Sequence, residues 1–334
     1  MHAVIELTHV ENIAVVMIAL GLTGGFILLV LGGESLVRGS VAVALRIGVS
    51  PLLIGLTLVG FGTSTPELVT SVNAALIGSP GIAVGNVVGS NIANILLILG
   101  LAAVIRPVRA RPEAFYRDGS MLALSTLACV AACLVGVLGG LAGTALVTLL
   151  AAYLVFTYWK ERTQPDASAA MHASEAESRS PALPSVWLNL LFAIGGIVLT
   201  ILGAQLLVDN AIVLARSLAV SESIIGLTIV AVGTSLPELV TSVVASWRNQ
   251  SDVALGNVVG SNIFNVLGVL GITAVVQPLV VPAQILDFDL WVMLGVTALL
   301  LVFAVTGWRL SRTEGLILLG LYAAYLAWLG KAAA

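Results

Sequence analysis

Charged residues are scarce in this sequence. Only 9% of its 334 residues are Asp, Glu, Lys or Arg, whereas 59% are hydrophobic, and its mean hydropathy is +1.11. Because a soluble domain carries about a quarter charged residues, this composition excludes an ordinary soluble protein. Apolar runs of about 20 residues recur, the length that a helix needs to cross roughly 30 Å of hydrocarbon. The chain is therefore predicted to be an all-α polytopic membrane protein in a lipid bilayer.

Histidine and cysteine are almost absent as well. The three histidines, His2, His9 and His172, lie outside the predicted spans, which argues against a histidine metal site or proton relay. The only cysteines, Cys129 and Cys133, stand four residues apart in one span. We interpret them as small packing residues. No cofactor and no nucleic-acid partner are expected.

Ten membrane spans are predicted. Their bounds are 12–36, 50–78, 82–105, 119–140, 143–159, 186–210, 221–247, 253–276, 289–308 and 314–330. A polar linker at 160–185, with the composition of a disordered segment, separates a first repeat (1–159) from a second (186–334). Because each repeat has an odd number of spans, the second enters the membrane from the opposite side. The fold is therefore predicted to be two inverted five-helix repeats.

Lys and Arg are unevenly divided between the two sides of this arrangement. With the N-terminus outside, twelve of the fourteen are cytoplasmic, and only Arg216 and Lys331 lie outside. Cytoplasmic loops carry an excess of Lys and Arg. Both termini are therefore predicted to be external, with the linker cytoplasmic, in a protein of the cell (inner) membrane.

Acidic residues near the span ends fall into two groups. Glu34 stands four residues before Arg38, a spacing that predicts an ion pair on one helix face. The others are interpreted as solvated surface charge on the outer side: Glu222, Asp252, Asp287 and Asp289.

One block of sequence occurs twice. Residues 55–100 and 226–271 align without a gap at an offset of 171, and 28 of the 46 paired positions are identical. Each copy contains a GTSxPE motif, at Gly62–Glu67 and Gly233–Glu238, followed by GNVVGSNIxN. Because polar residues are costly inside a membrane, a duplicated set predicts a binding site built from two half-sites.

The proline of each GTSxPE motif is expected to break its helix near mid-membrane. Pro66 and Pro237 lack the backbone donor of a continuing helix, so backbone carbonyls are freed. Ser64-x-x-Glu67 and its counterpart also spell capping boxes. An ionised glutamate at this depth costs roughly 3 kcal/mol, whereas a cap recovers only about 1 kcal/mol. Glu67 and Glu238 are therefore predicted to bind a cation, with capping as the structural alternative.

The second duplicated element supplies serine and asparagine. Ser90 and Asn94 share a helix face, as do Ser261 and Asn265, and these four are predicted to contact an ion. The remaining amides are interpreted as hydrogen-bonding residues between helices: Asn86, Asn91, Asn257 and Asn262. An all-oxygen set with a charge near −2 suits a hard cation such as Ca²⁺. Na⁺ accepts the same oxygens, whereas Mg²⁺ ranks lower because it demands a tighter octahedron.

The doubled GTSTPE/GTSLPE and GNVVGSNIAN/GNVVGSNIFN resemble the alpha-repeats of the calcium/cation antiporter superfamily, in its sodium/calcium exchanger branch of prokaryotic type. The resemblance covers nearly the whole chain. It implies that spans 2, 3, 7 and 8 surround the ions and that spans 1 and 6 slide past this core. It also implies a ligand set: Thr63, Ser64, Glu67, Ser90, Asn94, Thr234, Ser235, Glu238, Ser261 and Asn265, with the Gly60 and Ala231 carbonyls. Several prokaryotic and potassium-dependent relatives carry Asp at the position of Asn265, so a potassium requirement does not carry over.

These observations predict a secondary antiporter that exchanges Ca²⁺ for Na⁺ by alternating access. Exchange of Ca²⁺ for H⁺ at the same two glutamates is the alternative. Na⁺ is preferred because Asn94 and Asn265 are neutral, where proton-exchanging relatives tend to place carboxylates. A passive channel is less favoured, because inverted repeats within one chain favour alternating access. An enzyme is not expected, since no nucleophile and base meet at mid-membrane, and the oligomeric state stays open.

Overall fold

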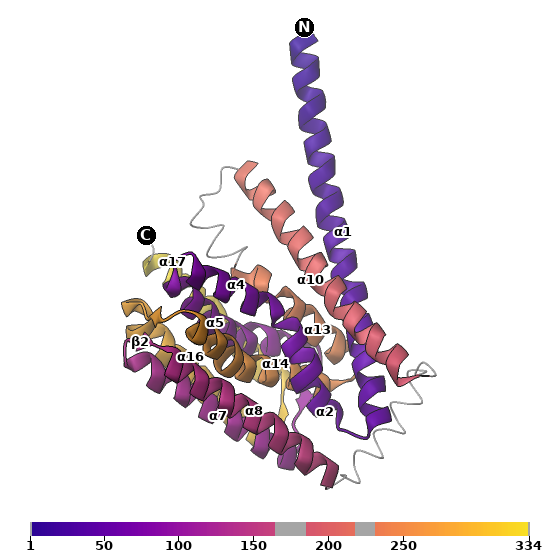
Figure 1. Ribbon diagram of the computed structural model, residues 1–334. Coiled ribbons are helices and arrows are strands. Elements are labelled where there is room, and N and C mark those ends of the chain that lie inside the picture. The colour runs from indigo at the N-terminus through magenta and orange to yellow at the C-terminus, as the bar shows by residue number, and fades with distance from the viewer. Residues whose placement is uncertain (1, 164–184, 218–230, 333–334) are drawn as a thin grey trace.

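The computed structural model describes residues 2–163, 185–217 and 231–332, which are almost entirely helical (Figure 1). Most of the predicted linker, 164–184, lies outside the described residues. So do residues 218–230, which include Glu222 and the beginning of the predicted span 221–247.

The helices of the two halves follow the same order, and the symbol η marks π-helical segments. The first half contains α1 (His2–Ile47), α2 (Pro51–Ile54), η1 (Gly55–Val59), α3 (Gly60–Thr63), α4 (Thr65–Leu76), α5 (Pro80–Ala93), η2 (Asn94–Leu99), α6 (Gly100–Ile105), α7 (Pro112–Leu134) and α8 (Gly140–Thr163). The second contains α10 (Val186–Ser217), α12 (Ala231–Thr234), α13 (Leu236–Trp247), α14 (Ser251–Phe264), η4 (Asn265–Leu270), α15 (Gly271–Val276), η5 (Ile285–Asp289), α16 (Leu290–Val305) and α17 (Arg312–Ala332).

Eight helical segments in the described ranges are long and apolar enough to cross a membrane, and they coincide with eight of the ten predicted spans. The other two predicted spans, 50–78 and 221–247, are the ones that carry the GTSxPE motifs, and both are interrupted there. The predicted bounds of the first span were wrong. Helix α1 continues well past residue 36 and ends at Ile47. Arg38 and Arg46 do not end it, because arginine is a good helix former.

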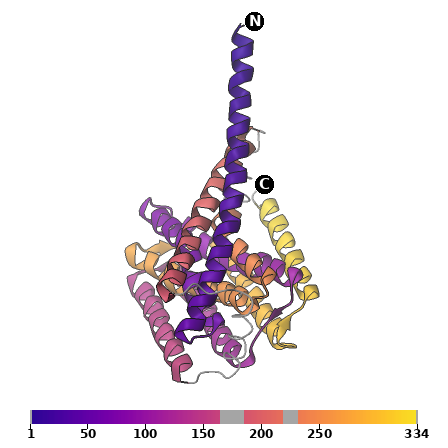
Figure 2. The ribbon, with the colours of Figure 1, turned by 90° about the vertical axis from the view of Figure 1, so that its right-hand side faces the viewer.

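Helices α1 and α10 lie side by side along one flank of the molecule, and the N-terminal part of α1 projects beyond the other helices (Figures 1 and 2). Glycines bring the two backbones into contact. A Cβ added at Gly32 would lie 2.6 Å from the Thr200 nitrogen, and one added at Gly196 would lie 2.7 Å from the Gly32 oxygen. Small residues at such positions let membrane helices approach closely.

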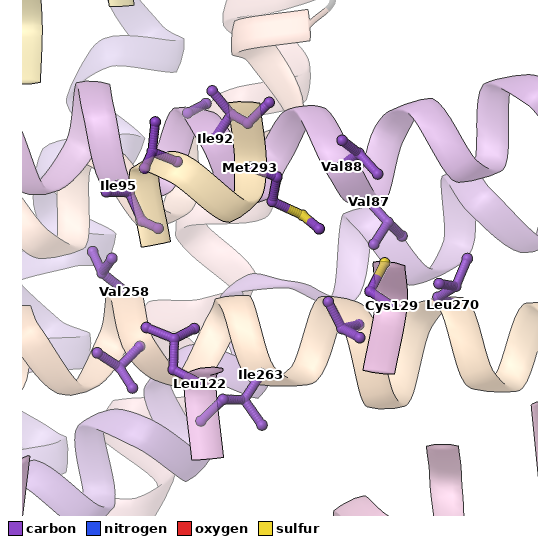
Figure 3. Close-up of a cluster of buried hydrophobic side chains, with 14 of the residues drawn as sticks. Val87, Val88, Ile92, Ile95, Leu122, Cys129, Val258, Ile263, Leu270 and Met293 are labelled. Carbon is purple, nitrogen blue, oxygen red and sulfur yellow. The ribbon is translucent and has the colours of Figure 1, made fainter. Parts of the chain in front are cut away.

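The interior is formed by two composite helices, α5–η2–α6 and α14–η4–α15. In their apolar 18-residue stretches, 72% and 83% of the residues are buried. Figure 3 shows side chains of these helices meeting those of α7 and α16, among them Ile92, Leu122, Ile263 and Met293. Cys129 and its neighbour Cys133 are free, buried members of the same cluster. Their interpretation as packing residues is confirmed.

Equivalent contacts recur across the two halves. Thr126 and Thr297, 171 residues apart, place their hydroxyl oxygens 3.4 Å from each other. Strand β1 (Val108–Arg109) pairs with β4 (Arg309–Leu310), and β2 (Val137–Leu138) pairs with β3 (Leu279–Val280). Adding 171 to the bounds of β1 gives those of β3, so β1 and β3 are equivalent strands of the two halves. Each of them pairs with a strand of the opposite half. Such exchange indicates an approximate two-fold axis between the repeats.

The acidic residues at the span ends are less exposed than predicted. Asp252 lies 2.7 Å from Arg111 in an ion pair and therefore shares the side of that arginine. Asp289 is only 6% exposed and accepts a hydrogen bond of 2.9 Å from the Tyr325 hydroxyl. The interpretation of both as solvated charges was wrong, because each has a partner on a neighbouring segment, and the placement of Asp252 on the side opposite to Arg111 was wrong as well. Asp287 is exposed, as predicted.

Candidate cation site

The two GTSxPE motifs break their helices at equivalent points. Ser64 separates α3 from α4 with ψ 9°, and Ser235 separates α12 from α13 with ψ 8°. In each case proline occupies the first turn of the new helix, as the missing backbone donor requires. The predicted helix breaks are confirmed.

The serines at these breaks bond across the repeat interface. The Ser64 hydroxyl donates to Glu238 Oε1 at 2.9 Å, and the Ser235 hydroxyl donates to Glu67 Oε1 at 3.3 Å. Neither serine makes a side-chain cap to its own helix. The capping alternative is therefore wrong for the serines, and each half positions the carboxylate of the other.

The two glutamates are buried at the beginning of α4 and α13. Glu67 is 1% exposed and Glu238 is fully buried. The second oxygen of each carboxylate, Oε2, has no hydrogen-bond partner. A buried carboxylate oxygen without a partner costs several kcal/mol unless a cation approaches it.

The Gly60 carbonyl links the first motif to helix α14. It accepts a hydrogen bond of 3.2 Å from the Ser261 hydroxyl. The Thr63 hydroxyl lies 3.3 Å from the same carbonyl and 3.2 Å from Asn257 Oδ1. The remaining predicted ligands occupy the matching elements: Ser90 is buried in α5, Ala231 begins α12, and Thr234 ends it half-buried.

Four asparagine amides bond to one another where α5–η2 meets α14–η4. Asn94 Nδ2 donates to Asn262 Oδ1 at 2.9 Å, and Asn265 Nδ2 donates to Asn91 Oδ1 at 3.1 Å. Asn91 and Asn262 in turn donate to each other's backbone carbonyl at 3.3 and 3.4 Å. The Oδ1 atoms of Asn94 and Asn265 are left buried and without a partner.

Two further amides hold the glutamate-bearing helices. Asn86 Nδ2 donates to the Glu67 carbonyl at 3.2 Å, and Asn257 Nδ2 donates to the Glu238 carbonyl, also at 3.2 Å. Each amide also donates to a serine hydroxyl on the helix that carries the glutamate, α4 or α13. Because Asn91 and Asn262 bond between helices as well, the structural interpretation of these four asparagines is confirmed.

The π-helical segments η2 and η4 begin at Asn94 and Asn265 themselves. Short π-helical turns inside α-helices often occur at functional sites. No π-helical segment was predicted from the sequence. The matching position of two asparagines in the repeat was the available signal, but it does not specify a change in helical pitch.

The chemistry of the site follows from its unpartnered atoms. Four buried side-chain oxygens lack a donor: Glu67 Oε2, Glu238 Oε2, Asn94 Oδ1 and Asn265 Oδ1. No group of three or more His, Cys, Asp or Glu that could hold a metal occurs among the described residues. Two carboxylates with neutral oxygens fit a hard cation better than a soft transition metal.

Comparison with known proteins points to one family. The profile of the family described as sodium/calcium exchanger protein matches residues 17–160 and 188–331. The chain is 36% identical over 315 residues to the inner membrane protein YrbG of Escherichia coli, covering 91% of this chain and 94% of YrbG. It is 33% identical over 339 residues to the sodium/calcium exchanger MaX1 of Methanosarcina acetivorans, covering 90% and 95%. A solved structure of the sodium-calcium exchanger NCX_Mj, soaked with Na⁺ and Sr²⁺, superposes with a TM-score of 0.80 at 32% identity, covering 93% of this chain and 98% of that one.

Proposed function

This chain belongs to the sodium/calcium exchanger family, and we propose that it exchanges Ca²⁺ for Na⁺ across the membrane by alternating access. The observation that carries the proposal is the set of four buried oxygens that lack a donor, two of them on carboxylates. A cation bound among these residues would give oxygen atoms that lack a donor a favourable partner. Antiport follows if the site releases one cation only in exchange for the other.

Glu67 and Glu238 are the proposed central ligands. Two carboxylates neutralise one Ca²⁺, and attraction between opposite charges is strong where water is excluded. The hydroxyls, amide oxygens and carbonyls around them complete the proposed set: Thr63, Ser64, Thr234, Ser235, Ser90, Ser261, Asn94, Asn265, and the carbonyls of Gly60 and Ala231. Several Na⁺ ions can share the same oxygens.

The asparagine amides support Na⁺ over H⁺ as the counter-ion. Asn94 and Asn265 carry no ionisable proton, and their Nδ2 groups already donate to Asn262 and Asn91. Protons would therefore have only two carboxylates to use, and the duplicated hydroxyls would contribute only to the binding of Ca²⁺. Exchange of Ca²⁺ for H⁺ at Glu67 and Glu238 is the alternative.

Gradient-driven flux separates these two functions. The purified chain is reconstituted into vesicles loaded with ⁴⁵Ca²⁺, and an inward Na⁺ gradient is imposed at constant pH. We expect rapid Ca²⁺ release that a choline gradient does not produce, and little release with a pH gradient alone. Strong pH-driven release that ignores Na⁺ would favour the proton alternative, and release down the Ca²⁺ gradient without any counter-ion would indicate a channel.

A further inference from the structure

A hollow of about 280 Å³ lies between α1 and the turn from α13 to α14, away from the cation site. Three arginines line it, each from a different element: Arg38 of α1, Arg106 after α6, and Arg248 after α13. Apolar and aromatic walls come from Val37 and Trp247. The distribution of Lys and Arg assigns this end of the molecule to the cytoplasmic face.

Positive charge in the hollow exceeds negative charge. Glu34 is the acidic partner of both Arg38 and Arg248, and Arg248 Nε lies 2.8 Å from its Oε2. Arg38 and Arg248 still keep about half of their side-chain surface exposed, at 48% and 50%. The Arg106 side chain is exposed and makes no ion pair or hydrogen bond with any described residue. The hollow is therefore lined by three guanidinium groups, and the one carboxylate beside them, that of Glu34, pairs with two of the three.

The repeat provides an internal comparison for this hollow. At the offset of 171, Arg38 corresponds to Asp209 and Arg106 to Gln277, while Arg248 corresponds to Ile77. None of the three equivalent positions carries an arginine, so the fold itself does not require arginine there. A general excess of positive charge on the cytoplasmic side does not require three arginines from separate elements to line one hollow.

We propose that this hollow binds a phosphate-type oxyanion, such as the headgroup of an anionic phospholipid or a free phosphate. Guanidinium groups match phosphate oxygens in geometry as well as charge. Basic pockets between membrane helices on the cytoplasmic side are known to hold anionic headgroups. Trp247 is 76% exposed, as befits an aromatic side chain at the membrane interface, where a lipid phosphate lies.

Such an anion would connect the first helix to the core. Arg38 belongs to α1, whereas Arg106 and Arg248 belong to the segments that follow α6 and α13. A phosphate held by all three would restrain movement of α1 relative to the site-bearing helices. This consequence for transport rests on the proposed function, whereas the binding site does not.

Binding can be measured without transport. The full chain, purified in a neutral detergent, is melted with phosphatidylglycerol or phosphatidylcholine added, and separately with inorganic phosphate or chloride at equal ionic strength. Arg106→Gln removes the unpaired guanidinium and introduces the residue found at position 277. Arg309→Gln is the matched control, since it removes an exposed arginine that does not line the hollow.

We expect phosphatidylglycerol, and not phosphatidylcholine, to raise the melting temperature of the wild type and of Arg309→Gln. Arg106→Gln should need about tenfold more lipid for the same shift, because it loses one charge-assisted contact. An equal Arg106-dependent shift with inorganic phosphate identifies free phosphate as a sufficient ligand, and its absence identifies the lipid headgroup. Equal shifts in wild type and Arg106→Gln would overturn the site, and so would equal effects of the two lipids together with no Arg106-dependent shift in inorganic phosphate.

The restraint on α1 has a separate test. Na⁺-driven Ca²⁺ release should be slower in vesicles containing phosphatidylglycerol than in phosphatidylcholine alone, and Arg106→Gln should remove the difference. Equal lipid sensitivity of the two forms would overturn the restraint. Failure of every form to exchange Ca²⁺ for Na⁺ would refute the proposed function and leave the binding result unaffected.

Discussion

At the residue scale, the site depends on reciprocity between the halves. Each glutamate uses Oε1 to accept a serine hydroxyl from the other repeat and leaves Oε2 buried without a partner. Each unpartnered amide oxygen, on Asn94 and Asn265, is oriented by a bond from the Nδ2 of the same amide to the opposite repeat. No half-site is complete alone, so a change in one repeat alters the geometry presented by the other.

Replacing either central carboxylate should nearly abolish transport. Glu67→Gln or Glu238→Gln keeps the shape of the side chain but removes one of two buried charges, and losing a buried partner costs about 3–5 kcal/mol. Ca²⁺ affinity should therefore fall at least about a hundredfold. Na⁺-driven ⁴⁵Ca²⁺ flux and Ca²⁺ binding measure the effect.

The control for this prediction is Glu113→Gln, which removes an exposed glutamate in the first turn of α7. It should transport like the wild type. Near-normal flux in a correctly folded Glu67→Gln or Glu238→Gln protein would remove these residues from the proposed ligand set.

The serine at the first helix break gives a smaller, more specific effect. Ser64→Ala removes the hydroxyl that donates to Glu238 Oε1 at 2.9 Å, a bond to a charged group worth about 1.5–3 kcal/mol. Ca²⁺ affinity should drop by about tenfold or more. Because this change also leaves Glu238 Oε1 buried without a partner, the melting temperature of the ion-free protein should fall as well. Loss of stability with unchanged affinity would instead indicate a capping role.

At the element scale, interrupted helices meet a continuous helix pair. The site-bearing helices are broken at Ser64 and Ser235, and they change from α-helix to π-helix at η2 and η4. By contrast, α1 and α10 run without interruption and touch through glycine backbones. Irregular backbone is tolerated inside a membrane only where protein or a wet cavity surrounds it. The irregular segments accordingly lie in the buried interior, where their backbone groups find protein partners, whereas the uninterrupted pair lies along one flank.

Close approach of α1 to α10 should be sensitive to a single methyl group. In Gly32→Ala, the new Cβ would meet the Thr200 nitrogen at 2.6 Å, so the helices must separate. Such overpacking typically costs 1–3 kcal/mol, and we expect lower stability with reduced flux. Thermal melting and Na⁺-driven Ca²⁺ release measure the two effects.

Gly24→Ala is the matched control on the same helix. Its nearest neighbour would be Leu206 Cδ2 at 3.6 Å, an ordinary contact distance. This variant should melt and transport like the wild type. Equal behaviour of the two alanine variants would contradict a tight glycine contact between α1 and α10.

At the scale of the whole molecule, an approximate two-fold axis relates the repeats. The Thr126–Thr297 contact and the crossed amides of Asn91 and Asn262 join residues that are 171 apart. The pairs of short strands are exchanged in the same way. An axis of this kind, lying in the membrane plane, places equivalent loops on opposite faces.

Cysteine labelling tests this inversion directly. Pro80 begins α5 and Gln250 immediately precedes α14, so each lies in the corresponding loop of its repeat. A membrane-impermeant thiol reagent should label Pro80→Cys from outside the cell and Gln250→Cys only from the cytoplasmic side. The parent protein is a suitable background because Cys129 and Cys133 are buried. Labelling of both positions from one face would contradict the inverted arrangement.

Much of this protein could be predicted from its sequence, because its signals are local or repeated. Hydropathy identifies the spans, since hydrocarbon excludes charge over about 20 residues. Proline marks the helix breaks because it lacks a donor, and the duplication singles out Glu67, Glu238, Asn94 and Asn265 as candidates. The length of α1 was underestimated because arginines near a helix end do not stop a helix.

Only the tertiary structure decided how these residues pair. Ser64 reads as a cap in the sequence, yet its hydroxyl bonds Glu238, 174 residues away. Asp252 reads as solvated charge, yet Arg111 neutralises it, and three arginines distant in sequence line one hollow. A local pattern fixes where a helix begins or breaks, because that depends on the neighbouring residues of the chain. The partner of a buried polar atom depends on which segments the fold brings together, and no local pattern contains that information.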